Sequence, residues 1–261
     1  MRLVSFAGGV GRLEDAGIVE LEAPRMLDWL RGYGHAETGR VLTEVELLAP
    51  VPTPPSVRDF YAYEEHAVTG ARLRGREIPG FWYQEPVFYF SNPASIVGPG
   101  ATITPPATER LDFELEIAAV IGVDGIAGFT LFNDWSARDV QLAEMSIGLG
   151  PAKGKDFATS IGPWLVTPDE LPYDGRLQLR ASAAINGEIV TESDAGAMHY
   201  SWPQLLERAG RDTVLRPGDV IGSGTLGRGC LLEFGEGRWL QSGDTVTLAA
   251  AGLGELTGHV R

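Results

Sequence analysis

Residues 111–117 read Leu-Asp-Phe-Glu-Leu-Glu-Ile, a strict alternation of apolar and acidic side chains. A period of two is typical of a β-strand, in which successive side chains point to opposite faces. One face would be apolar, and the other would carry Asp112, Glu114 and Glu116. The pattern allows two interpretations. The acidic face lies in water, or it binds a hard cation such as Mg²⁺, Ca²⁺ or Mn²⁺, which takes oxygen ligands.

Composition and charge narrow the class of protein. The 261 residues include a single cysteine, Cys230, so no internal disulfide can form, which fits a reducing cytoplasm. No apolar run reaches the roughly 20 residues that span a bilayer, and the first residues contain no secretory h-region. The net charge of −14 argues against nucleic acid or an anionic membrane as a partner. We therefore expect a soluble, cytoplasmic protein.

A proline-rich connector divides the chain. Four prolines lie between Pro50 and Pro55 and predict a stiff, extended segment. We therefore expect a small N-terminal domain over residues 1–50 and a larger domain over residues 51–261. The larger domain is punctuated by Gly and Pro and rich in strand-like segments, so the predicted class is α+β with mostly β structure. The pattern predicts helices over residues 23–31, 134–146 and 202–209, and a strand over residues 231–234.

The helix predicted over residues 134–146 carries three polar side chains at related positions. Asp134, Arg138 and Gln141 are spaced i, i+4 and i+7, which would place them on one helix face. In one interpretation Asp134 caps the helix and pairs with Arg138. In the other, an anionic ligand, a guanidinium donor and an amide donor face a common site. The spacing leaves both interpretations open.

Several other polar residues are candidates for a site. Lys155 lies in a Gly-rich loop, which can bring an ammonium and backbone N–H groups close to an oxyanion, although Asp156 excludes a phosphate loop of the GxxxxGK[ST] type. None of the four histidines forms a Cys/His cluster in the sequence, so a usual zinc site is not expected. His66 is either an exposed helix residue or a general base. The cluster of Arg72, Arg74 and Arg76 is a solvated loop or a contact for an anionic substrate.

Taken together, five ordered segments resemble the fumarylacetoacetate hydrolase family. They are Asp59-Phe-Tyr-x4-His66, Leu111-Asp-Phe-Glu-Leu-Glu116, Asn133-Asp-Trp-Ser-Ala-Arg-Asp-x-Gln141, Gly154-Lys-Asp-Phe-Ala-Thr159, and Gly222-Ser-Gly-Thr225 with Gly229-Cys-Leu-Leu-Glu233. The resemblance covers roughly residues 57–248. It implies a mixed β-sandwich or roll fold like the family's C-terminal domain, a homodimer, and a bound Mg²⁺ or Ca²⁺, with Mn²⁺ as another candidate.

The resemblance also implies roles for single residues. The implied metal ligands are Asp59, Glu114, Glu116 and Asp134, with Lys155 and Thr159 beside the ion, whereas Asp112 is a structural acid. The implied catalytic residues are His66, Glu233, Arg138, Gln141 and Lys155. His66 is the base that activates water, Glu233 orients it, and the other three hold the oxyanion. The implied substrate-binding residues are Tyr61, Gln141 and Thr225.

The implied reaction is hydrolysis of a C–C bond in a 1,3-diketo acid or a related dicarbonyl compound, in the catabolism of aromatic compounds. Thr69 stands where acylpyruvase-type members carry Glu, so the chain is expected to be closer to fumarylacetoacetate hydrolase proper. Gly75 stands where the family carries its substrate-carboxylate arginine, and Met145 stands where a tyrosine is expected. The candidate substitutes for the arginine are Arg72, Arg74 and Arg76. The alternatives are a decarboxylase, a tautomerase or isomerase, a dehydratase, or a metal-binding protein without catalysis.

Overall fold

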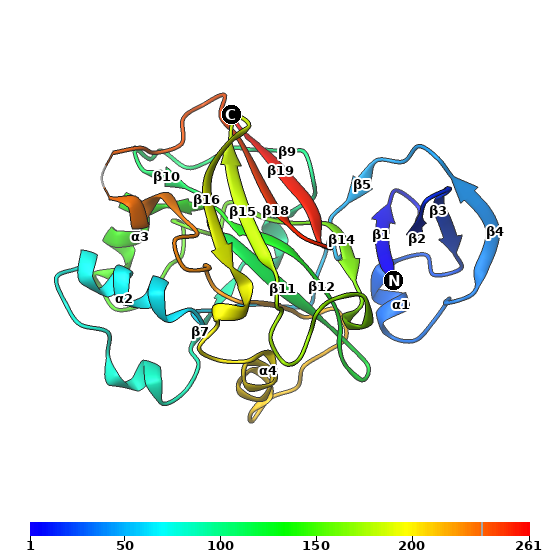
Figure 1. Ribbon diagram of the computed structural model, residues 1–261, viewed down its shortest axis with the longest axis horizontal. Coiled ribbons are helices and arrows are strands. Elements are labelled where there is room, and N and C mark those ends of the chain that lie inside the picture. The colour runs from blue at the N-terminus through cyan, green and yellow to red at the C-terminus, as the bar shows by residue number, and fades with distance from the viewer. Residues whose placement is uncertain (236) are drawn as a thin grey trace.

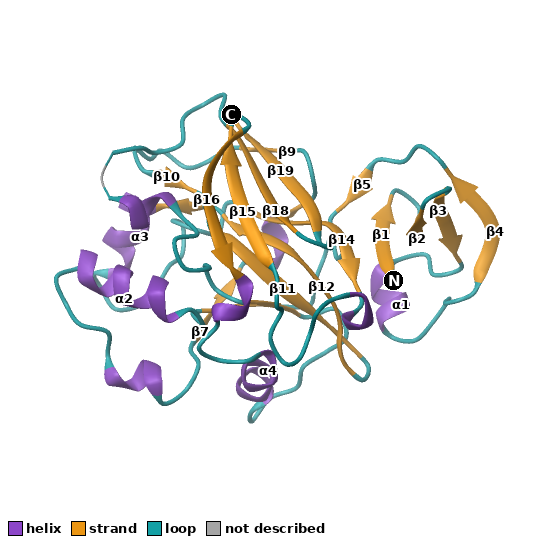
Figure 2. Ribbon diagram, in the orientation of Figure 1, coloured by secondary structure: helices purple, strands orange, loops and turns teal. Residues whose placement is uncertain are grey.

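The regular structure of the chain is mostly β-sheet, with short helices at its periphery (Figures 1 and 2). The computed structural model describes residues 1–235 and 237–261. The strands are β1 Arg2–Phe6, β2 Gly9–Glu14, β3 Gly17–Leu21, β4 Glu37–Leu42, β5 Leu47–Leu48, β6 Val57–Phe60, β7 Phe88–Ser91, β8 Ile96–Val97, β9 Ala101–Ile103, β10 Leu111–Asp112, β11 Leu115–Gly122, β12 Gly125–Asp134, β13 Ser136–Ala137, β14 Thr159–Val166, β15 Arg180–Ile185, β16 Glu188–Asp194, β17 Val220–Gly222, β18 Thr245–Ala250 and β19 Gly254–Val260. The helices are α1 Met26–Leu30, α2 Glu64–Leu73, α3 Arg138–Met145 and α4 Trp202–Gly210, with 3₁₀ turns η1 Gly80–Tyr83, η2 Pro93–Ser95, η3 Pro168–Glu170, η4 Ala195–Ala197 and η5 Leu231–Phe234.

A large sheet runs through most of the molecule in the order β4-β3-β2-β1-β14-β12-β11-β17-β6-β7. A second sheet, β16-β15-β18-β19-β9, packs against it. Both sheets are mixed, because β6 and β17 pair in parallel, as do β9 and β19, among antiparallel neighbours. The predicted β-rich α+β class is therefore confirmed. No helix in the described part of the chain is long and apolar enough to cross a bilayer.

The N-terminal strands continue the large sheet and lie at one end of the molecule (Figure 1). The link is β1, which pairs antiparallel with β14, with Leu3 opposite Leu165. Leu3 and Leu165 also belong to the same buried cluster. Residues 1–50 thus share backbone hydrogen bonds and a core with the rest of the chain, and the division into two domains at residue 50 stays a prediction.

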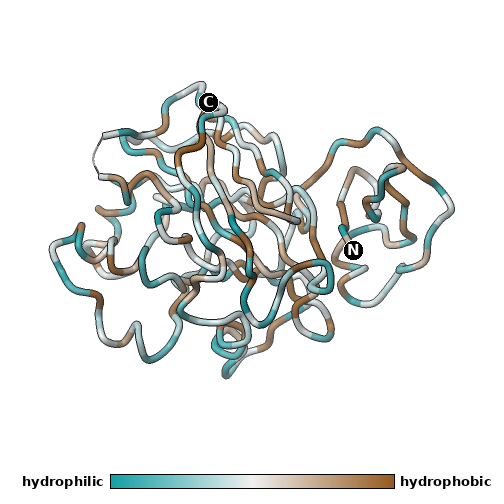
Figure 3. Tube along the Cα trace, viewed as in Figure 1, coloured by the Kyte–Doolittle hydropathy of each residue, from teal (hydrophilic) through white to brown (hydrophobic). Residues whose placement is uncertain are grey.

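The alternating segment forms two strands, β10 and β11, separated by Phe113 and Glu114. Its four apolar side chains all enter the core between the two sheets. Its three acids are buried too, because Asp112 and Glu116 have 0% and Glu114 has 4% of their surface exposed. The interpretation that the acidic face lies in water is therefore wrong. In Figure 3 the hydrophobic stretches follow the strands of the central body, whereas many outer loops are hydrophilic.

Two local predictions were wrong. The helix expected from residue 134 begins only at Arg138, because Asp134 ends β12 and pairs with Thr159 of β14. Ser136 and Ala137 form a further strand with β10. The strand expected over residues 231–234 is instead η5. By contrast, α4 begins with a capping box between Ser201 and Gln204, near the predicted bounds.

Candidate active site

A cavity of about 390 Å³ opens between α2, β7 and α3. Its volume suits a small organic substrate. Part of its wall is apolar and comes mainly from the loop around η1. The polar part contains most of the residues singled out in the sequence, namely Asp59, Tyr61, His66, Glu114, Glu116, Arg138, Gln141, Lys155 and Thr225. Segments far apart in the sequence therefore converge on one site.

Sheet register brings two of the acids together. Asp59 on β6 lies opposite Gly222 of β17, and Gly222 lies opposite Ala118 of β11, two residues beyond Glu116. A Cβ on Gly222 would lie 2.3 Å from Asp59 Oδ1, so only glycine leaves room for this carboxylate. The backbone N–H of Gly224 donates to the same oxygen at 3.2 Å. The glycines of this segment therefore shape the space that Asp59 occupies.

Asp59, Glu114 and Glu116 form a buried carboxylate cluster whose oxygens lie within 4.8 Å of one another. Within the described residues, Glu116 Oε2 and Asp134 Oδ1 are buried without a hydrogen-bond partner. Because buried polar atoms normally have a partner, these oxygens are suited to contact a positive group. A cluster of carboxylate oxygens is the ligand set that a hard divalent cation prefers. The residues therefore fit such a cation.

The electrostatics of the cluster support the same conclusion. Burial raises the pKa of Asp59 well above its ordinary value, and the charge of Asp134 raises this pKa further. Burial also raises the pKa of Glu116 strongly, and Asp59 adds to this effect. Burial would raise the pKa of Glu114 as well, but the charges of Lys155 and Arg138 outweigh burial and lower it. Asp59 and Glu116 thus resist ionisation unless a cation lies beside them.

Lys155 lies among the acids. Its Nζ is 2.5 Å from Glu114 Oε2 and 2.5 Å from Asp134 Oδ2. The hydroxyl of Tyr89 also donates to Asp134 Oδ2, at 2.5 Å. Tyr89 was missed in the sequence, where it reads as part of an aromatic strand, and only its pairing opposite Asp59 brings it to the site. Asp134 therefore contacts Lys155 and Tyr89, so the interpretation in which Asp134 caps the helix and pairs with Arg138 is wrong.

Arg138 instead joins two acids of the alternating segment. Its Nε donates to Asp112 Oδ2 and its Nη1 to Glu114 Oε1, both at 2.8 Å. Asp112 also accepts backbone N–H groups from Leu231 and Leu232, at 2.8 and 3.1 Å. Asp112 thus fixes the turn η5 relative to Arg138. This contact network agrees with the structural role expected for Asp112.

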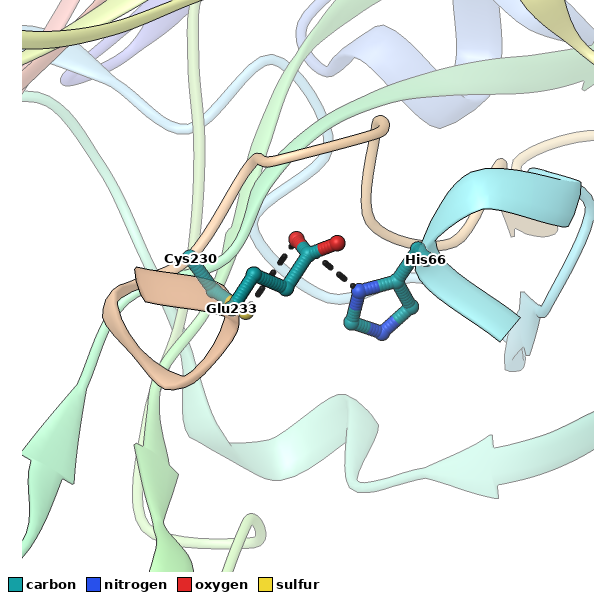
Figure 4. A group of neighbouring side chains, drawn as sticks. All are labelled: His66, Cys230 and Glu233. Carbon is teal, nitrogen blue, oxygen red and sulfur yellow. Dashed lines mark hydrogen bonds and ion pairs between the residues drawn. The ribbon is translucent and has the colours of Figure 1, made fainter. Parts of the chain in front are cut away.

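The turn η5 carries Glu233 toward His66 of α2 (Figure 4). The distance from His66 Nδ1 to Glu233 Oε2 is 3.1 Å, and both side chains are buried. The backbone N–H of Arg228 donates to the other oxygen, Oε1, at 3.1 Å. Cys230 also lies beside Glu233, so the fold brings a histidine and the cysteine together although the sequence contains no Cys/His cluster. The fold joins these residues across more than 160 positions of sequence, which spacing does not reveal.

The remaining predicted residues surround this centre. Thr225 Oγ1 donates to Glu116 Oε1 at 3.3 Å, and Gln141 Oε1 accepts from Arg138 Nη1 at 3.3 Å. The Tyr61 ring meets the His66 ring edge-on, with centroids 5.2 Å apart. Thr159 is buried, and its hydroxyl lies 3.4 Å from that of Ser91. Of the candidate arginines, Arg74 and Arg76 line the cavity, and Met145 lies there too.

The raised pKa values predict how pH acts on the metal-free protein. A carboxyl with a raised pKa in the folded state stabilises the fold below its unfolded pKa of about 4, and this stability is lost as pH rises through the folded pKa. Asp59 and Glu116 behave in this way. The lowered pKa of Glu114 affects the stability of the fold only at lower pH. In EDTA, the melting temperature should therefore fall as pH rises above about 4, and Mg²⁺ should reduce this fall. Identical melting profiles with EDTA and with Mg²⁺ would contradict the prediction.

Comparison with known proteins identifies one family, whose members here have names that state different activities. Residues 56–261 match the family described as "Fumarylacetoacetate (FAA) hydrolase C-terminal". A fumarylacetoacetase from Arabidopsis thaliana is 31% identical over 74% of this chain, which spans 61% of the plant protein's length. Oxaloacetate tautomerase YisK from Bacillus subtilis is 29% identical over 84% of this chain and 74% of that protein. A solved 5-carboxymethyl-2-hydroxymuconate delta-isomerase from Mycobacterium smegmatis has a TM-score of 0.77 at 27% identity, covering 100% of this chain and 99% of that chain.

Proposed function

The chain belongs to the fumarylacetoacetate hydrolase family, and we propose that it is a metal-dependent hydrolase that cleaves a C–C bond of a 1,3-diketo acid or a related dicarbonyl compound. The observation that carries the proposal is the His66–Glu233 pair beside the carboxylate cluster, at one cavity. A base that activates water is needed for hydrolysis. We further propose that the enzyme acts as a homodimer in the cytoplasm.

His66 is the proposed general base. Its Nδ1 faces Glu233, which leaves Nε2 for the proton of a water molecule in the cavity. Glu233 selects this orientation of the ring and stabilises the imidazolium that forms when the proton is taken. The Arg228 N–H and the turn η5 hold the carboxylate in place. This division of roles requires a neutral His66 at the start of each turnover.

The polar residues around the cluster have proposed roles in charge stabilisation. Asp59, Glu114, Glu116 and Asp134 would hold a divalent cation such as Mg²⁺. When bound, the cation supplies positive charge that stabilises an enolate leaving group. The ammonium of Lys155 and the amide of Gln141 provide donors for an oxyanion on the substrate carbonyl. Arg138 is committed to Asp112 and Glu114, so its proposed contribution is to orient these groups as well as to add charge.

The cavity suggests how a substrate acid would bind. Arg74 and Arg76 line it and offer guanidinium groups, which recognise carboxylates well. The apolar side of the cavity, which includes Ile78, Trp82 and Leu232, suits a carbon chain. We therefore propose that one of these arginines takes the place of the family's substrate-carboxylate arginine, for which Gly75 has no side chain.

Isomerisation or tautomerisation is the second candidate function. It is favoured by the relatives described as a tautomerase or isomerase, at 29% and 27% identity. Such reactions use proton transfer and enolate stabilisation but add no water to the product. The His66–Glu233 pair favours hydrolysis, because a base of this kind is what water activation requires. Decarboxylation and dehydration use the same enolate chemistry and are outcomes of the same test.

Turnover of a small panel separates these functions. Acylpyruvates, fumarylacetoacetate and oxaloacetate would be incubated with the enzyme and Mg²⁺, and the products identified by mass. Hydrolysis gives two fragments whose combined mass exceeds that of the substrate by one water. Conversion without a change in mass would indicate an isomerase or tautomerase, loss of CO₂ alone a decarboxylase, and loss of one water a dehydratase. Any of these results in place of fragments would overturn the hydrolase proposal.

A further inference from the structure

His66, Cys230 and Glu233 form a second group of converging ligand atoms, distinct in its residues from the carboxylate cluster (Figure 4). One nitrogen, one sulfur and one carboxylate oxygen lie within 4.8 Å of one another. Glu233 Oε2 is central, at 3.1 Å from His66 Nδ1 and 3.5 Å from Cys230 Sγ. Because the chain has only one cysteine, no other thiol competes for this role.

The chemistry of the three atoms differs from that of the carboxylate cluster. Imidazole nitrogen and thiolate sulfur are ligands for borderline-soft cations such as Zn²⁺, whereas Mg²⁺ and Ca²⁺ prefer oxygen. Zinc bonds of about 2.0–2.3 Å in a tetrahedral site place neighbouring ligand atoms about 3.3–3.5 Å apart. The two distances from Glu233 Oε2 are close to these values, and the ligand atoms of all three side chains lie within 4.8 Å of one another.

A buried nitrogen points into this group. His66 has only 6% of its surface exposed, and within the described residues its Nδ1 has no hydrogen-bond partner. Nδ1 lies 3.1 Å from Glu233 Oε2, so the two side chains can form an ion pair when His66 is protonated. The Arg228 N–H holds the other oxygen of Glu233, which keeps Oε2 directed at His66 and Cys230. His66 also lines the cavity, which provides a route for an ion.

We propose that His66, Cys230 and Glu233 form an inhibitory site for Zn²⁺, beside the Mg²⁺ site and separate from it. Binding releases the thiol proton of Cys230 to solvent and forms bonds from zinc to Sγ, Nδ1 and a Glu233 oxygen, with water as a fourth ligand. With zinc on Nδ1, the neutral imidazole carries its proton on Nε2. It then has no lone pair for the proton of water. This inhibition rests on the proposed role of His66 as the base, but binding itself does not.

Cobalt is a direct probe of the site, because Co²⁺ replaces Zn²⁺ at such ligands and shows a near-ultraviolet charge-transfer band when a thiolate binds it. The protein would be saturated with Mg²⁺ and titrated with Co²⁺. We expect the band to rise to one cobalt per chain and to disappear when Zn²⁺ is added. Since Cys230 is the only cysteine, the band identifies its sulfur without any variant. Absence of the band would overturn the site, whatever the activity.

Two substitutions sharpen the test. Cys230→Ser should weaken Zn²⁺ binding at least about 100-fold, because even partners outside the ligand shell contribute 10–100-fold. Cys230→Ala serves as a second variant should the first fold poorly. His35→Gln is the matched control, because His35 lies near the protein surface, away from the group, and its loss should leave the cobalt band unchanged.

Activity measurements then distinguish a failure of the proposed zinc site from a failure of the proposed role of His66. With Mg²⁺ in excess, Zn²⁺ should inhibit the wild-type enzyme, and the inhibiting concentration should rise at least about 100-fold in Cys230→Ser, each variant being compared with its own zinc-free rate. Equal inhibition of both proteins would mean that zinc acts at the carboxylates, which overturns the inhibitory site. A cobalt band without any inhibition by zinc would leave the site standing and contradict the role of His66 as the base.

Discussion

Replacement of Glu116 by glutamine is expected to weaken Mg²⁺ binding at least about 100-fold. Glutamine keeps the shape of the side chain but removes the charge and one oxygen ligand from the cluster with Asp59 and Glu114. The same change should leave the metal-free protein as stable as before, or more so. The reason is that burial and the Asp59 charge raise the Glu116 pKa, so its ionised form is unfavourable without a cation. Calorimetric titration with Mg²⁺ and melting curves in EDTA measure the two effects.

The matched control for this variant is Glu188→Gln, which removes a charge from an exposed position of β16. It should leave both the Mg²⁺ affinity and the melting temperature nearly unchanged, since surface charges contribute little. Unchanged Mg²⁺ affinity in Glu116→Gln, or a large loss of stability in EDTA, would mean that Glu116 has a structural role and that the cation does not bind at this cluster.

The second large effect is expected from His66→Asn. Asparagine retains a donor toward Glu233 but provides no base, so cleavage of a diketo acid should fall about 10²–10⁴-fold. Mg²⁺ affinity should remain nearly the same, because His66 belongs to the group with Glu233 and not to the carboxylate cluster. Single-turnover rates with the panel substrate that is cleaved fastest measure the loss of cleavage. Titration with Mg²⁺ measures the affinity for the metal.

His199→Asn is the control for histidine replacement. His199 packs against the rings of Trp82 and Tyr83 and is not among the residues grouped with Glu233, so its loss should affect turnover far less. A His66→Asn enzyme that cleaves diketo acids at nearly the wild-type rate would contradict water activation by His66. Loss of cleavage and of Mg²⁺ binding together would show that His66 supports the metal centre, and the proposed division of roles would be wrong.

Much of the acidic centre could be predicted because its signal is local. The alternation of acidic and apolar residues follows strand geometry directly, and Glu114 and Glu116 do reach one cluster. Sequence spacing alone allowed a solvated face. In the structure this face is buried, and Arg138 and Lys155 approach from other parts of the chain and pair with Glu114. The capping box of Ser201 and Gln204 is equally local, which explains why the start of α4 was predicted well.

The other features of the site depend on contacts between segments that are distant in the sequence. Asp134 has a spacing that suits a helix, but backbone pairing with Thr159 places it at a strand end. Tyr89 reaches the site only because β7 pairs with β6, which sets it opposite Asp59. Cys230 lies far from His66 in sequence and meets it only when η5 packs near α2. Local propensity carries no information on such register and packing, so these features required the structure.

The central claim is that water enters the product by way of the His66–Glu233 pair, and oxygen labelling tests this most directly. A substrate of the panel that the enzyme converts would be incubated in H₂¹⁸O with Mg²⁺, and the products examined by mass spectrometry over the first turnovers. We predict one ¹⁸O atom in the carboxylate of one fragment, with the label appearing at a rate that His66→Asn lowers about 10²–10⁴-fold. Products that form at the same rate without ¹⁸O in a new carboxylate would contradict hydrolysis and support an isomerase, tautomerase or decarboxylase.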